Sequence, residues 1–125
     1  MMNETRLIGS FFKPRQKAIA KYATQTEAIQ DKVLRQLVAK AGKTEWGLYH
    51  DYQNIKSYQD FQQRIPVKTY EEIKEYVDRM RHGEKNILWP GEVVWYAKSS
   101  GTTNDKSKFI PVSKEGLQTV HYAGG

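Results

Sequence analysis

Apolar residues recur at helical spacing in the first part of the chain. They form an i, i+4, i+5, i+8, i+9 stripe, which predicts an amphipathic helix whose apolar side belongs to the core. Thr24 and Glu27 stand at capping-box spacing before the stripe, and Gly42 follows its last position. We therefore expect this helix to start at Thr24 and stop at Gly42, after a separate short helix around residues 18–22. The stripe consists of Ile29, Val33, Leu34, Leu37, Val38 and Ala41.

A second helical pattern lies between residues 69 and 83. Thr69 and Glu72 again have the spacing of a capping box, and Gly83 follows the last apolar position. Residues 58–65 are predicted to form one or two helical turns that end before Pro66. The aromatic residues between 46 and 52 show no periodicity that predicts an element. The apolar positions of the second pattern are Ile73, Tyr76, Val77 and Met80.

The pattern changes after residue 86 to short apolar runs separated by turn residues. Residues 89–91 read Trp-Pro-Gly and predict a tight turn, and residues 93–97 and 109–112 read as strands. Ser113 can cap a last helix that contains Leu117 and Val120. The expected fold is therefore α/β, as an α+β fragment, with residues 1–86 mainly helical and residues 87–125 forming a strand, a loop, a strand and a helix start.

The polar insert between the two predicted strands is rich in hydroxyl groups and contains one glycine. Such a loop can hold phosphate oxygens with its hydroxyls and backbone N–H groups, and glycine permits close approach of a ligand. The same residue types also make ordinary surface turns. The insert lacks the Gly-Lys-Ser/Thr of a Walker A loop. The candidate phosphate-binding residues are Ser99, Ser100, Gly101, Thr102, Thr103, Asn104 and Lys108.

Residues 95–111, Trp-Tyr-Ala-Lys-Ser-Ser-Gly-Thr-Thr-Asn-Asp-Lys-Ser-Lys-Phe-Ile-Pro, resemble the phosphate-loop motif of the auxin-responsive promoter family of acyl-acid amido synthetases. These are adenylate-forming enzymes. The resemblance extends to Thr-Glu-Trp-Gly at 44–47, Ile-Pro-Val at 65–67, Tyr-Glu-Glu-Ile at 70–73, Gly-Glu-Lys-Asn at 83–86 and Leu-Trp-Pro-Gly at 88–91, in the family's order. Members of that family are several-fold longer, so the chain resembles the N-terminal portion of the large adenylation domain.

The resemblance implies acyl activation. ATP and a carboxylic acid would form an acyl adenylate, and an amino-acid amine would then take the acyl group. Mg²⁺ would bridge the phosphates, although no carboxylate of the chain can be assigned to it. The resemblance also implies that the chain alone is inactive, because the remaining pockets would lie beyond residue 125. Strands 93–97 and 109–112 would then lack sheet neighbours, so self-association or partial disorder is expected near residues 87–125.

The net charge of +6 is concentrated at the N-terminus, where residues 1–41 carry eight Lys/Arg against three Asp/Glu. The simplest interpretation of this basic segment is a solvated helix face. The alternative interpretation is a small non-enzymatic module that binds nucleic acid or an acidic partner. The chain has no cysteine, no apolar signal segment and no membrane-length run, which predicts a cytoplasmic protein. His50 is expected at the surface, His82 at its helix end, and the three histidines predict no metal site.

Overall fold

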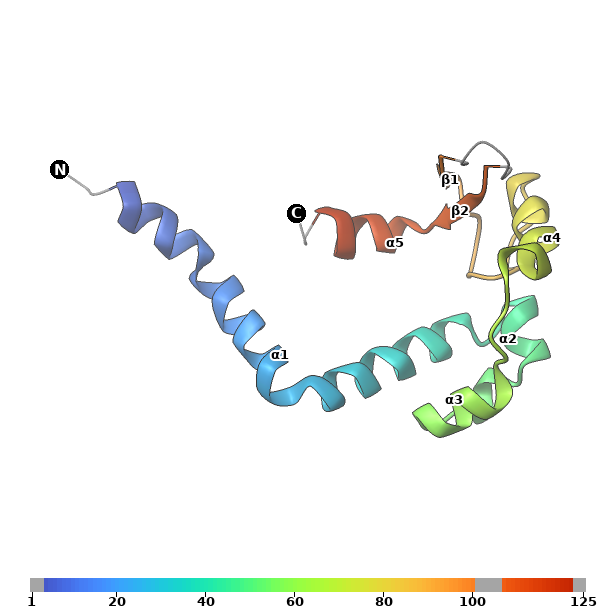
Figure 1. Cartoon of the computed structure of the whole chain (residues 1–125), viewed down its shortest axis with the longest axis horizontal. Helices are drawn as coiled ribbons and strands as arrows, with labels where there is room; N and C mark the ends of the chain where they lie inside the picture. The colour runs from blue at the N-terminus through green and yellow to red at the C-terminus, as the bar shows by residue number, and fades with distance from the viewer. Residues whose placement is uncertain (1–3, 101–106, 123–125) are drawn as a thin grey trace.

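The computed structural model describes residues 4–100 and 107–122, which form helices and one small antiparallel sheet, in agreement with an α+β fragment. Figure 1 shows a long bent helix leading to a cluster of short elements. No helix in these two ranges has the length and apolar character needed to cross a membrane. The elements are α1 (Glu4–Ala41), α2 (Glu45–Tyr49), the 3₁₀ turn η1 (Tyr52–Asn54), α3 (Tyr58–Arg64), α4 (Tyr70–Arg81), β1 (Trp95–Lys98), β2 (Phe109–Val112), α5 (Lys114–Gly116) and the π-helical segment η2 (Leu117–Tyr122).

Helix α1 consists of two helical segments that meet at a kink, close to the predicted boundary between two helices. It begins at Glu4 and bends at Gln25, whose backbone departs from helical geometry with φ −131° and ψ 27°. The Thr24 hydroxyl donates back to the carbonyl of Lys21 at 3.4 Å, in the first segment, and the second segment starts at the kink, one residue after the predicted start. The predicted end was right, since α1 stops at Ala41.

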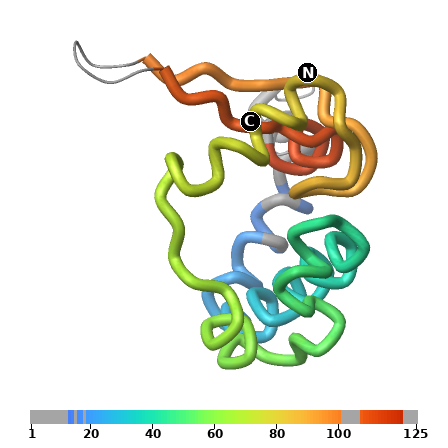
Figure 2. Tube along the Cα trace, turned by 90° about the vertical axis from the view of Figure 1, so that its right-hand side faces the viewer, coloured from blue at the N-terminus to red at the C-terminus, as the bar shows by residue number. Residues whose placement is uncertain are grey.

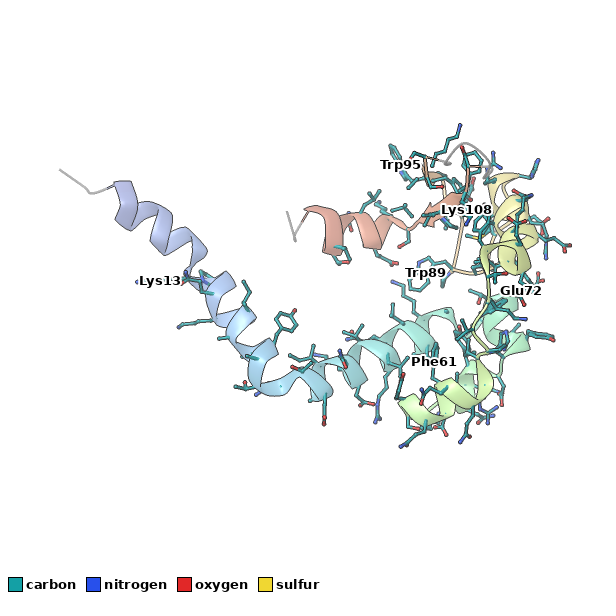
Figure 3. All side chains as sticks on the ribbon, in the orientation of Figure 1. Lys13, Phe61, Glu72, Trp89, Trp95 and Lys108 are labelled. Carbon is teal, nitrogen blue, oxygen red and sulfur yellow. The ribbon has the colours of Figure 1, made fainter. Side chains whose placement is uncertain are left out.

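The apolar stripe of α1 is buried only at its C-terminal end within the described structure. Val38 and Ala41 are 4% and 5% exposed, whereas Val33 and Leu37 are about half exposed. The other stripe residues line an open groove of about 690 Å³ between α1 and α3, with Phe61 on its α3 side (Figure 3). The prediction that the whole stripe is core was therefore wrong, because α3 covers only part of it.

The backbone of α2 lies very close to the C-terminal end of α1. Thr44, which is 1% exposed, caps α2 by accepting from the Gly47 N–H at 3.0 Å, and its own hydroxyl donates to the Ala41 carbonyl at 2.7 Å. A Cβ atom at Gly47 would lie 2.1 Å from the same carbonyl oxygen. The N–H groups of Glu45 and Trp46 donate to the carbonyls of residues 86 and 87, which ties α2 to the segment after α4.

The hydrophobic core lies where α4 meets the segment that leads into β1. Met80, Ile87 and Val93 are buried together, and Tyr76 and Tyr96 pack against them. The predicted apolar side of α4 is therefore confirmed. Figure 2 shows β1 and β2 side by side at this end of the molecule. The core thus contacts β1 through Tyr96, on the strand that leads into the polar insert.

Glu115 joins three parts of the chain. Its carboxylate pairs with Lys40 at the end of α1 and accepts from the Trp89 indole N–H at 3.1 Å. The Lys40 hydrogen bond, followed by that of Trp89, lowers the pKa of the Glu115 carboxyl. Ser113 caps α5 by accepting from the Gly116 N–H at 3.0 Å, as predicted.

Helix α4 begins with the predicted capping box. The Glu72 carboxylate accepts from the Thr69 backbone N–H at 2.8 Å and from its hydroxyl at 2.9 Å. These bonds, together with one from Lys68, lower the pKa of Glu72 to about 2. At the other end, Gly83 adopts φ 92° where the helix stops, as its position predicted.

The Glu72 capping box makes the free energy of unfolding depend on pH in the acid range. Because the folded pKa lies below the unfolded value of 4.5, Glu72 stabilises the fold fully above about pH 4.5 and progressively less as the pH falls toward 2. We expect the free energy of unfolding of wild type to exceed that of Glu72→Gln at pH 6, with the difference shrinking toward pH 2. Chemical denaturation across this range measures it. Glu71→Gln, on the exposed face of the same turn, is the control, and an unchanging difference would contradict the assignment.

Candidate functional site

The two-stranded sheet holds both ends of the polar insert together. Lys98 of β1 lies opposite Phe109 of β2, and the pairing continues one residue further. The Ser99 N–H donates to the Lys108 carbonyl at 2.9 Å, and the Lys108 N–H donates to Ser99 Oγ at 3.0 Å. We call Ser99 and Lys108 the loop neck. It closes the strand–loop–strand unit that the sequence predicts.

The loop neck brings two of the predicted phosphate-binding residues into contact. Ser99 and Lys108 are half-buried, and the neighbouring Ser100 is exposed. Since a hydroxyl can accept and donate at the same time, Ser99 can accept from Lys108 and still donate to a phosphate oxygen. The binding role of all seven candidates stays a prediction. Four of them lie outside the described residues: Gly101, Thr102, Thr103 and Asn104.

Helix α4 contacts the loop neck from the side, which the sequence reasoning missed. The Phe109 N–H donates to the Tyr70 hydroxyl at 3.0 Å, and Lys108 Nζ lies 5.8 Å from the centroid of the Tyr70 ring. From the other end of α4, the Arg81 guanidinium carbon lies 3.6 Å from the centroid of the Phe109 ring. The 11-residue spacing of Tyr70 and Arg81 was a usable signal, because it puts both on one face of the helix.

Arg81 is linked to further charged groups of α4. Arg81 Nη1 donates to Asp78 Oδ1 at 3.3 Å, and Asp78 also pairs with Lys74. The Lys74 hydrogen bond is the main cause of a lowered pKa of the Asp78 carboxyl, so Asp78 stays ionised. Burial raises the pKa of the Tyr96 hydroxyl on β1. With Lys98 and Lys108 at the two ends of the polar insert, the region presents cations where an anionic ligand is predicted.

Arg79 on the same helix has a different role. Its guanidinium donates to both carboxylate oxygens of Glu45 at 2.8 and 2.7 Å, and to Glu84. These bonds raise its pKa further above an already high value. Arg79 therefore ties α2 to α4 and does not serve the loop neck.

The histidines correct one prediction. His50, expected at the surface, is 9% exposed and packs against Trp46, with Nδ1 3.1 Å from the Arg64 carbonyl. The reason is its position as the C-cap of α2, which turns it inward toward the end of α3. His82 lies at the end of α4 as predicted, with Nδ1 2.7 Å from the Asp78 carbonyl. Over the described ranges, no cluster of three His, Asp or Glu side chains could hold a metal ion.

The chain is similar to plant acyl-acid amido synthetases. It is 32% identical over 96 residues to indole-3-acetic acid-amido synthetase GH3.15 of Arabidopsis thaliana, an alignment that covers 76% of this chain and 16% of the relative. It is 30% identical over 104 residues to GH3.17 of the same plant (82% and 17%). To jasmonoyl–L-amino acid synthetase JAR4 of Nicotiana attenuata it is 28% identical over 97 residues (74% and 16%).

The chain thus spans about a sixth of the length of these curated relatives. The model of the GH3 family N-terminal domain matches residues 15–124, which include α2 to α5 and the loop neck. A match over nearly the whole chain confirms the family resemblance found in the loop motif, and the chain belongs to the GH3 family.

Proposed function

We propose that this chain forms the N-terminal part of the large domain of an ATP-dependent acyl-acid amido synthetase. Residues 1–86 supply the helical support, and residues 87–125 supply the strand–loop–strand unit that binds the phosphates of ATP. The observation that carries the proposal is the loop neck, which closes a hydroxyl-rich insert in a chain of the GH3 family. The names of the relatives support the reaction class.

The proposed reaction has two steps. A carboxylate oxygen of the acyl acid attacks the α-phosphorus of ATP, a new P–O bond forms, and the bond to pyrophosphate breaks. The amine of an amino acid then attacks the acyl carbon, loses a proton, and AMP leaves. Negative charge on the phosphates opposes the first step, so hydroxyl and N–H donors and the Lys108 ammonium would stabilise its transition state.

The donor set fits the phosphates of ATP better than it fits a metal ion. Ser99, Ser100 and Lys108 offer hydroxyl and ammonium donors at the backbone pairing of the loop neck. Mg²⁺, when bound with ATP, would neutralise phosphate charge. The chain's own residues would hold the nucleotide, and Mg²⁺ would bind together with ATP as its complex.

The test uses the complete protein that contains this chain. ATP–pyrophosphate exchange is measured with a panel of carboxylic acids that includes indole-3-acetic and jasmonic acids. We expect exchange that depends on Mg²⁺ and on one or more of the acids. A parallel titration with an oligonucleotide at two salt concentrations tests the alternative: salt-sensitive binding without any exchange would overturn the proposal in favour of a nucleic-acid-binding module.

A further inference from the structure

Helix α4 contacts β2 at the residue that follows the loop neck. Tyr70, at the first position of α4, and Arg81, at its last, both reach Phe109. We propose that Tyr70 and Arg81 are positioning residues that hold Phe109, and through it the loop neck, in the geometry that binds ATP. This inference rests on the proposed function.

The backbone pattern explains why Tyr70 can reach this strand. In an antiparallel pair, successive residues direct their N–H groups alternately toward the partner strand and away from it. Lys108 bonds toward Ser99, so the Phe109 N–H points away from β1. The Tyr70 hydroxyl accepts from it at 3.0 Å. Tyr70 thereby satisfies a donor on the outer edge of β2 and fixes that edge relative to α4.

Arg81 holds the same residue through its side chain. At about 100° per residue, a spacing of 11 residues leaves Tyr70 and Arg81 only about 20° apart around the helix, so both project from one face. The guanidinium carbon lies over the Phe109 ring, 3.6 Å from its centroid, which is within the range of a cation–π contact. Asp78 restrains Arg81 from the preceding turn at 3.3 Å. Phe109 is therefore held at its backbone and at its ring.

The consequence for ATP binding follows from adjacency. Lys108 directly precedes Phe109, and its backbone forms half of the loop neck. Without these contacts, Phe109 and the loop neck are less restrained before ATP binds. Part of the binding free energy must then order the loop neck, so the affinity for ATP falls. Once ATP is bound, the loop neck of a variant has the same geometry as the loop neck of wild type. Loss of Tyr70 or Arg81 should therefore raise KM for ATP while leaving kcat nearly unchanged.

The test is Tyr70→Phe in the complete protein, which removes one hydroxyl and keeps the ring. Tyr58→Phe is the matched control, because Tyr58 is 62% exposed on α3, far from β2 (Figure 1). We expect Tyr70→Phe to raise KM for ATP by about 3- to 10-fold, in line with the loss of one hydrogen bond. Its kcat should stay within about twofold of wild type, whereas a purely structural role would lower Tm and leave KM for ATP unchanged.

Hydrogen exchange at the Phe109 amide provides a readout that needs no activity. The amide is expected to exchange faster in Tyr70→Phe than in wild type and Tyr58→Phe. An unchanged exchange rate or an unchanged KM overturns the inference. Arg81→Ala should raise KM in the same direction, and a drop in kcat alone would also overturn it. If wild type catalyses no pyrophosphate exchange, the proposed function fails instead, and the Phe109 amide still shows whether Tyr70 holds the strand.

Discussion

Replacing Ser100 or Thr102 by alanine in the complete protein is expected to slow ATP–pyrophosphate exchange by about 100-fold. Each substitution removes one hydroxyl donor predicted to face the phosphates as pyrophosphate leaves. Ser100 directly follows the loop neck and is exposed, so its hydroxyl is available to a ligand. A donor that acts on developing charge contributes more in the transition state than in the ground state, and the loss should therefore fall on kcat.

This pattern is opposite to the one expected for Tyr70→Phe, so the two kinds of residue can be told apart. Thr119→Ala is the control, since its exposed hydroxyl in η2 donates to the backbone carbonyl of Glu115 in α5. It should leave exchange unchanged. Exchange at the wild-type rate in both Ser100→Ala and Thr102→Ala would remove these residues from the proposed site.

Substitution of Gly47 by alanine is expected to lower the free energy of unfolding by about 3 kcal/mol. A Cβ atom there would lie 2.1 Å from the backbone oxygen of Ala41 and 3.0 Å from its carbon, and backbone atoms cannot rotate aside. Either α1 and α2 separate or the Thr44 cap breaks. Alanine's helix propensity, which favours it by about 1 kcal/mol, does not offset this clash. Chemical denaturation followed by circular dichroism measures the change.

Gly42→Ala is the matched control for Gly47→Ala. Its Cβ would make contacts of 3.4 Å with the carbonyls of Val38 and Ala39, which is an ordinary van der Waals distance. Its effect should stay within about 1 kcal/mol. Equal stabilities of the two variants would show that the backbone approach between α1 and α2 is not the cause.

Local signals in the sequence predicted the elements near the site well. The capping box of Thr69 and Glu72, the stop at Gly83 and the Ser113 cap all depend on residues three to five positions apart, and all are confirmed. The second strand was predicted with its observed bounds, and the first was predicted to start two residues early and to end one residue early. Local hydrogen bonding and alternation of side chains determine these features, so they can be read from short windows.

Features that depend on distant contacts could not be predicted. Helix α2 has five residues and no apolar period, and two of its N–H groups are satisfied by carbonyls about 40 residues away. The burial of His50 depends on the end of α3. The contact of Tyr70 with Phe109 spans 39 residues. The sequence thus predicted the loop of the candidate site but not the contacts that α4 makes with Phe109.

The ion pair between Lys40 and Glu115 joins residues 75 positions apart. During synthesis, Lys40 and Trp89 are made before Glu115, so both stay without their common partner until residue 115 has been translated. Contacts of such high sequence separation form late and slow folding. The bent first helix therefore reaches its final anchorage only after the strands on both sides of the insert have been made.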